Sequence, residues 1–186
     1  MSNKRDEIIA TTCRLMEMQG YHATGLNQIL EESGAPKGSL YYYFPEGKEA
    51  LAIEAIEHTS RLIAANLRAG MAAHDHPADA ITDFLQTLAH YVQTSGFQAG
   101  GPITAIALEA ASTNEALNAA CRDAYQDWQA IVEAKLNEGG YTAVRARRLA
   151  SLVIAVIEGA IILSRTQRNV APLLDAATEI GVLLRC

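Results

Sequence analysis

The sequence has few of the residues that mark a disulfide-stabilised or metal-binding protein. It contains three cysteines, Cys13, Cys121 and Cys186, which are odd in number, widely spaced and without a C-x-x-C pair. This pattern indicates neither a disulfide framework nor a zinc site. We interpret the three side chains as small apolar groups and expect no metal and no other cofactor.

Long apolar segments are also missing. The longest apolar run, residues 152–163, contains Glu158, whereas a helix needs about 20 apolar residues to cross a bilayer. The first six residues, M-S-N-K-R-D, lack the apolar stretch and the cleavage site of a secretory signal. We therefore predict a buried helix at residues 152–163, no membrane partner and a cytoplasmic protein.

Signals for β-strands are scarce as well. Alternating β-branched runs are rare, only 5 prolines occur, and alanine, leucine, isoleucine, glutamate and glutamine are frequent. Hydrophobic residues make up 49% of the chain against 19% charged residues, which provides enough apolar surface to order it. These features predict an all-α fold, which the periodicity divides into about nine helices.

The N-terminal part of the chain has the pattern of three helices. Apolar residues at helical spacing, ended by Gly20, predict a helix over residues 4–19. A second helix is predicted over residues 25–33, and a third over residues 36–44, because Pro36 suits the first turn of a helix. Two helices joined by a corner that contains glycine form a helix-turn-helix unit, whose second helix is the candidate for the DNA major groove.

Longer helices are predicted downstream, where the chain shows no internal repeat. Their limits follow from the apolar periodicity and from breaks at glycine or proline. The predicted ranges are residues 47–70, 78–95, 103–111, 114–138, 142–166 and 171–184.

The formal net charge of −6 argues against a protein held on nucleic acid by bulk charge. Between Ser33 and Pro45 the only ionised side chain is Lys37. A DNA contact in this stretch would therefore depend on neutral donors, aromatic hydroxyls, helix N-termini and a few cations, supplied by two subunits together.

Residues 20–51 read G-Y-H-A-T-G-L-N-Q-I-L-E-E-S-G-A-P-K-G-S-L-Y-Y-Y-F-P-E-G-K-E-A-L and closely resemble the DNA-binding domain of the tetracycline-repressor (TetR) family. Residues 100–109, G-G-P-I-T-A-I-A-L-E, resemble its lincomycin-resistance-repressor branch (LmrA/YxaF-like). The resemblance implies a helix-turn-helix DNA-binding domain at residues 1–48 and a helical effector-binding and dimerisation domain at residues 49–186. It also implies a transcriptional repressor that a small molecule releases from a pseudo-palindromic, double-stranded DNA operator.

Four residues are suited to DNA contact at their positions. Thr24, at the predicted N-cap of the second helix, is expected to place its hydroxyl against a phosphate. Lys37 and Ser39, on the exposed first turn of the third helix, are expected to reach base edges. Gly38 has no side chain and allows close backbone approach, and the resemblance implies that it touches a base.

Three consecutive tyrosines follow, and they cannot share one face of a helix because neighbouring residues point about 100° apart. Leu40 and Phe44 are placed on the core side. By resemblance, Tyr42 and Tyr43 contact phosphates, and Tyr41 has a mixed role that is partly structural. In isolation, this aromatic stretch would instead be read as core packing.

Three further residues complete the expected DNA contacts. Lys48, near the start of the fourth helix, is expected to reach a phosphate. Asn27 or Gln28 on the second helix is expected to add a base contact.

The resemblance places the homodimer contact in the last two helices, which are more apolar than surface helices need to be. It places the effector cavity among the helices between residues 62 and 128. Few ionisable groups occur among the candidate lining residues, so we expect a hydrophobic or aromatic effector. The candidates are Phe84, Leu88, Tyr91, Phe97, Ile103, Ile106, Tyr125 and Trp128.

Other classes of function remain open at this stage. An enzyme would use His74, Asp75 and His76, or His90 with Glu109, but neither a third clustered ligand nor a nucleophile motif accompanies them. A DNA-binding protein without an effector, and activation rather than repression, are also compatible with the sequence.

Overall fold

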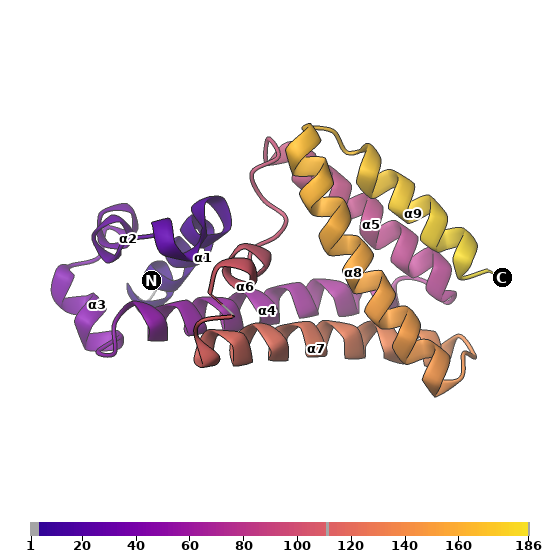
Figure 1. The fold of residues 1–186 in the computed structure, drawn as a ribbon, viewed down its shortest axis with the longest axis horizontal. Coiled ribbons are helices and arrows are strands. Elements are labelled where there is room, and N and C mark those ends of the chain that lie inside the picture. Colours follow the sequence, from indigo (N-terminus) through magenta and orange to yellow (C-terminus); the bar gives the residue numbers. More distant parts are fainter. Residues whose placement is uncertain (1–3, 111, 186) are drawn as a thin grey trace. The chain divides into compact units, whose positions relative to one another are not determined.

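The computed structural model describes residues 4–110 and 112–185, and within these ranges the chain forms nine helices and no strand. The prediction of an all-α fold with about nine helices is therefore confirmed. The helices are α1 Lys4–Ala23, α2 Leu26–Ser33, α3 Lys37–Tyr43, α4 Lys48–Ala72, α5 Pro77–Thr94, α6 Thr104–Ala110, α7 Glu115–Glu138, α8 Ala143–Gln167 and α9 Ala171–Leu183 (Figure 1).

Most helix ends lie close to the predicted ones, and α1 departs furthest. Gly20 was expected to end this helix, yet a further helical turn follows it before the chain leaves α1 at Ala23. Gly20 itself has φ 83° and ψ 176°, a conformation that is essentially restricted to glycine. The glycine therefore breaks α1 without ending it.

The chain divides into two compact units. Unit 1 comprises Met1–Arg61 and Pro102–Ala124, and unit 2 comprises Leu62–Gly101 and Tyr125–Cys186. Helices α4 and α7 each contribute residues to both units.

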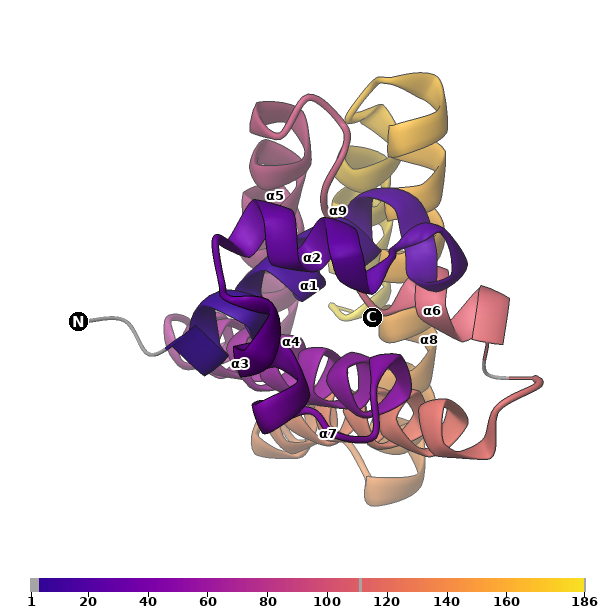
Figure 2. The same ribbon diagram turned by 90° about the vertical axis from the view of Figure 1, so that its left-hand side faces the viewer.

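Unit 1 has a core shared by the first four helices. Its buried side chains include Ile8, Leu15, Ile29, Leu40 and Leu51, each no more than 2% exposed. Helix α1 packs against α2, α3 and α6 (Figure 2). Since these apolar side chains recur at helical spacing, burying them fixes the orientations of the short helices α2 and α3.

Unit 2 is built around α5, α8 and α9, which lie side by side in Figures 1 and 2. Helix α8 is long and apolar enough to cross a membrane by length and composition alone. It packs on α5 and α9, however, and buries one face that includes Val153, Ile157 and Ile161, whereas Leu152, Ile162 and Leu163 of the predicted buried helix are exposed.

Candidate nucleic-acid interface

The turn between α2 and α3 is set by three successive residues. Gly34 caps α2 with φ 62° and ψ 20°, in the left-handed region that favours glycine. Ala35 is buried in the core of unit 1, and Pro36 is the N-cap of α3. The two helices and this corner form the helix-turn-helix unit that the sequence predicts.

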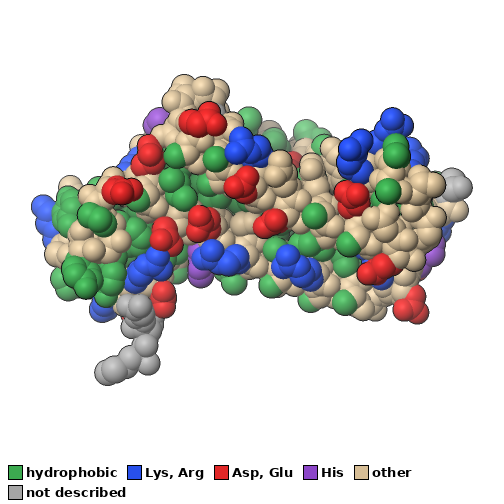
Figure 3. Space-filling view, turned by 90° about the horizontal axis from the view of Figure 1, so that it is seen from below, with side chains coloured by type: hydrophobic (Ala, Val, Ile, Leu, Met, Phe, Trp, Pro, Cys, Tyr) green, Lys and Arg blue, Asp and Glu red, His purple; other side chains and the backbone are tan. Residues whose placement is uncertain are grey.

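Helix α3 has one buried side and one exposed side. Leu40 and the C-cap residue Phe44 are 0% and 2% exposed, as predicted for the core side. Tyr41 and Tyr42 are 49% and 79% exposed. Figure 3 colours tyrosine with the hydrophobic side chains, and these gather over the end of unit 1 that carries α2 and α3. The exposed side is therefore rich in aromatic hydroxyls and poor in charge.

The tyrosine that packs inward is Tyr43. It is half-buried against the core of unit 1 and meets the ring of Tyr42 edge-on, with 5.1 Å between the ring centroids. The sequence had placed a partly structural role at Tyr41. Because Tyr43 lies three residues after Leu40, it shares that residue's buried face of the helix.

The first turn of α3 presents the predicted readers of sequence. Lys37 and Gly38 are exposed and Ser39 is half-buried. A Cβ added at Gly38 would meet no atom within 4 Å, so nothing in the chain itself requires glycine there. Close approach to a ligand would explain the glycine, as predicted from the sequence.

The predicted N-cap at Thr24 was wrong by one residue. Gly25 is the N-cap of α2, and Thr24 is fully buried, with its hydroxyl donating to the Gly20 carbonyl oxygen at 2.7 Å. The hydroxyl is thus used to close the corner between α1 and α2. A phosphate contact through this hydroxyl has no support in the geometry.

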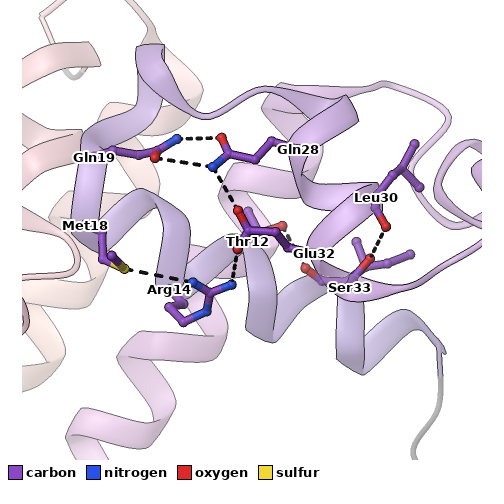
Figure 4. A network of polar contacts seen from close by, with 9 residues as sticks. Thr12, Arg14, Met18, Gln19, Gln28, Leu30, Glu32 and Ser33 are labelled. Carbon is purple, nitrogen blue, oxygen red and sulfur yellow. Dashed lines mark hydrogen bonds and ion pairs between the residues drawn. The ribbon is translucent and has the colours of Figure 1, made fainter.

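Gln28 belongs to a polar network that joins α1 to α2 (Figure 4). Gln19 Nε2 donates to Gln28 Oε1 at 2.8 Å, and Gln28 Nε2 donates to Glu32 Oε1 at 2.9 Å. The same Glu32 carboxylate pairs with Arg14 at 2.5 Å, and the hydrogen bonds from Arg14 and Gln28 lower its pKa. The neighbouring Asn27 is exposed, whereas the amide of Gln28 is already engaged in these hydrogen bonds.

Lys48 lies on the corner between α1 and α2. Its ammonium donates to the His22 carbonyl oxygen at 3.4 Å and lies 4.4 Å from the centroid of the Tyr21 ring. Partial burial lowers the pKa of Lys48, and the nearby Glu109 carboxylate opposes that shift. The lysine is positioned by its neighbours rather than fully extended into solvent.

Most cations of unit 1 are paired with carboxylates. Lys37 has no ion-pair partner among the residues that the structure describes, and it is therefore available to an external anion. The paired groups are Lys4 with Glu7, Arg5 with Glu54, Arg14 with Glu32, Arg61 with Glu57, and Arg122 with Asp123.

The eight predicted effector contacts fall in different units. Ile103 and Ile106 are buried in unit 1. The others belong to unit 2, where Trp128 is buried and meets the ring of Tyr125 edge-on at 5.3 Å, and Tyr91 is 51% exposed. The remaining three are half-buried: Phe84, Leu88 and Phe97.

The histidines considered for an enzyme have separate local roles. His76 is the N-cap of α5, where its Nδ1 accepts the Ala78 N–H at 3.1 Å. His74 Nε2 lies 3.2 Å from Asp83 Oδ2. Across residues 4–110 and 112–185 no group of three or more potential metal ligands is found.

Sequence reasoning missed the position of Glu109. Its Oε2 accepts the backbone N–H of His22 at 2.9 Å, 87 residues away along the chain. Helical periodicity carries no information about a polar contact between such distant segments. In the sequence, Glu109 stands out solely as the last residue of 100–109, the segment that resembles the LmrA/YxaF-like branch.

Comparison with known proteins identifies two matching sequence families. "Bacterial regulatory proteins, tetR family" matches residues 8–55, and "Transcriptional regulator LmrA/YxaF-like, C-terminal domain" matches residues 77–179. The HTH-type transcriptional regulators YxaF and LmrA of Bacillus subtilis (strain 168) are 41% and 42% identical over 183 residues. These alignments cover 98% of this chain and 96% and 97% of the respective relatives.

Solved structures agree with this result. A TetR transcriptional regulator from Chloroflexus aurantiacus J-10-FL has a TM-score of 0.84 and 30% identity, covering 98% of this chain and 94% of its own. A TetR regulator from Legionella pneumophila has a TM-score of 0.88 at 20% identity, covering 99% and 98%, and supports the fold alone.

Proposed function

The chain belongs to the TetR family of bacterial regulatory proteins, with an LmrA/YxaF-like C-terminal domain, and from this premise we propose that it is a repressor released from its operator by a small hydrophobic or aromatic molecule. As a member, it is a DNA-binding transcriptional regulator. The proposal adds the direction of regulation, the effector and the residues that carry them. It also assigns the protein to the cytoplasm, where operator DNA is found.

The observation that supports the DNA contacts most strongly is the two-sided character of α3. Leu40 and Phe44 fix the helix on the core, while Lys37, Gly38 and Tyr42 remain exposed. A helix fixed in this way can enter the major groove with its exposed side toward the bases. Lysine reads guanine acceptors, and tyrosine hydroxyls bind phosphates, which fixes the register of the helix on the duplex.

We assign Lys37, Gly38 and Ser39 to the bases and Tyr42 with Lys48 to the phosphates. Tyr41 and Asn27 are exposed and are kept as additional contacts. The remaining predicted residues act through packing or hydrogen bonds, as the geometry above indicates: Thr24, Gln28 and Tyr43.

A homodimer would give the protein two such helices. Unit 2 exposes large apolar side chains on α8 and α9, where a water-exposed surface would favour polar ones. Isologous packing of these helices in two subunits would bury them and match a pseudo-palindromic operator. They include Leu152, Ile162, Leu163, Leu174 and Val182, between 42% and 54% exposed.

The proposed effector binds among the predicted aromatic and aliphatic side chains of unit 2. In unit 2, Phe84, Leu88 and Phe97 are half-buried, and Trp128 is buried beside Tyr125. Such side chains favour an apolar ligand, and the tyrosine and indole groups provide polar atoms for its orientation.

The test begins with selection of bound DNA from a random duplex pool, followed by binding curves on the recovered site. Lys37→Ala and Tyr42→Ala are each expected to weaken binding at least about fivefold, since one good contact is worth about 1–3 kcal/mol. Their unfolding curves should match that of the wild type, because both side chains are exposed.

Arg147→Ala provides a matched control, since this exposed cation lies on α8 in unit 2. It should bind the selected site as the wild type does. Wild-type affinity in both α3 variants would refute the assignment of the interface. A panel of hydrophobic and aromatic compounds, screened for release of the selected DNA, then tests the effector.

A further inference from the structure

The break in α1 at Gly20 creates a docking place for a carboxylate from another helix. Because the backbone of Gly20 is not helical, the chain turns and the His22 N–H donates to Glu109 Oε2 of α6 at 2.9 Å. A Cβ added at Gly20 would lie 1.9 Å from Glu109 Oε1 and 2.7 Å from its Cδ. The carboxylate therefore rests directly against the backbone of Gly20, where a side chain would overlap it.

The same corner, residues 20–24, is held by one hydrogen bond of its own and by one from elsewhere in unit 1. Thr24 Oγ1 donates to the Gly20 carbonyl oxygen at 2.7 Å, and Lys48 Nζ donates to the His22 carbonyl oxygen at 3.4 Å. His22 is therefore bonded to both groups, since its N–H donates to Glu109 and its carbonyl oxygen accepts from Lys48. A displacement of Glu109 would alter the corner and the ammonium together.

Helix α6 is well placed to transmit such a displacement. It packs on α1 within unit 1, whereas the chain on both sides of residues 102–124 belongs to unit 2. A second polar link joins the same segment to the start of α4, where Asn114 Nδ2 donates to Glu49 Oε2 at 2.5 Å. One link ends on His22, which Lys48 contacts, and the other ends on Glu49, which follows Lys48 in the sequence.

We propose that Glu109 is a positioning residue for operator binding: its hydrogen bond to the His22 N–H couples α6 to the corner that orients Lys48. This inference rests on the proposed function, since it concerns the same DNA interface. Fixing the corner before DNA arrives removes ordering entropy from the binding step. By linkage, an operator that needs the fixed corner must also stabilise α6.

The informative comparison is between Glu109→Gln and Glu109→Ala. Both variants lose the carboxylate charge, and with it any repulsion of phosphates, but glutamine retains an oxygen that can accept the His22 N–H. Glu109→Ala is expected to bind the selected operator about tenfold more weakly than Glu109→Gln. Amide hydrogen exchange at His22 should be at least about tenfold faster in the alanine variant than in the glutamine variant.

Operator binding should also slow exchange across Thr104–Ala110 in the wild type and in Glu109→Gln, and leave it unchanged in Glu109→Ala. Glu115→Ala is the control, because Glu115 is an exposed glutamate of the same unit at the start of α7. It should leave His22 exchange unchanged. Equal operator affinities and equal His22 exchange in the two Glu109 variants would overturn the proposal.

Failure of the proposed function would look different. In that case the wild type would select no DNA, while the exchange of the His22 amide in the free protein would still show whether Glu109 holds the corner. Loss of the far-ultraviolet helical signal in Glu109→Ala would mark a folding defect. Glu109→Leu would then replace it, because leucine fills a similar volume without an acceptor oxygen, and equal His22 exchange in the leucine and glutamine variants would overturn the proposal.

Discussion

At the scale of single residues, α3 separates packing from recognition over a very short stretch. Leu40 and Phe44 are buried, while Tyr42 between them is 79% exposed. The sequence predicted this division for Leu40 and Phe44 because they are four residues apart. It did not identify Tyr43 as the inward tyrosine, since three adjacent aromatic residues offer no contrast in polarity.

The two cysteines that the structure describes have different surroundings, but burial raises the pKa of both thiols. Cys13 donates its Sγ–H to the Ala55 carbonyl oxygen at 3.4 Å, and burial raises the pKa of its thiol. Burial alone raises the pKa of Cys121 to about 11. The third cysteine, Cys186, lies outside the described residues.

These pKa shifts predict slow reaction with thiol reagents. Because the thiolate is the reactive form, raising the pKa from 9.0 to about 11 lowers its fraction at pH 8 by about 100-fold at Cys121. In a Cys186→Ser background, the rate of modification of Cys121 should keep rising from pH 9 to about pH 11, where an ordinary thiol levels off.

The control is the same protein unfolded in guanidinium chloride, in which both thiols should react at the ordinary rate. Rapid modification of the folded protein at pH 8 would show that these thiols are less protected than their burial indicates.

At the scale of elements, apolar periodicity and glycine positions were sufficient to predict the helices. The limits of α7, α8 and α9 agree with prediction to within one residue, because Gly139, Gly140 and Pro172 punctuate strong apolar patterns. The corner between α1 and α2 was less predictable. There, the chain is held by hydrogen bonds in which Thr24 and Lys48 donate and Glu109 accepts.

The candidate site was predictable to the extent that it is local in sequence. Lys37, Gly38 and Tyr42 are exposed on one short helix, as expected from their spacing. Gln28 and Thr24 are held by residues of α1, and Lys48 meets the backbone of His22. Contacts between separate helices are decided by packing, which the sequence pattern does not contain.

The unusual backbone of Gly20 predicts a penalty for any side chain there. Gly20→Ala should lower the free energy of unfolding by about 1–3 kcal/mol, since its φ of 83° is unfavourable for alanine and the Glu109 carboxylate must move away. Urea unfolding followed by circular dichroism measures the change.

Gly38→Ala gives the opposite comparison within the same unit. It has open space around it and lies inside α3, so alanine should be neutral or stabilising by up to about 1 kcal/mol. If Gly20→Ala were as stable as Gly38→Ala, the strain assigned to the break in α1 would be mistaken.

At the scale of the whole molecule, the exposed apolar side chains of α8 and α9 predict a dimer that charge can disrupt. A glutamate buried in an apolar interface is left without a partner, so Leu163→Glu combined with Leu174→Glu should yield monomers at micromolar concentration. Light scattering coupled to size-exclusion chromatography reports the mass.

Leu62→Glu is the matched control, because Leu62 is 55% exposed on α4 rather than on α8 or α9. It should remain a dimer. A wild-type protein with the mass of one chain would rule out the proposed assembly, and a dimeric double variant would place the interface elsewhere.

The pairing of most cations of unit 1 with its own carboxylates has a consequence for the response to ionic strength. Each phosphate that a protein cation neutralises releases a condensed counterion and contributes about −0.9 to the slope of log K against log salt concentration. With Lys48 of each of two subunits as the cation assigned to a phosphate, titrations between about 50 and 200 mM KCl should give a slope of about −2, and a slope of about −8 would contradict this. Such a regulator would stay bound to its operator at intracellular salt concentrations that dissociate a more basic protein from DNA.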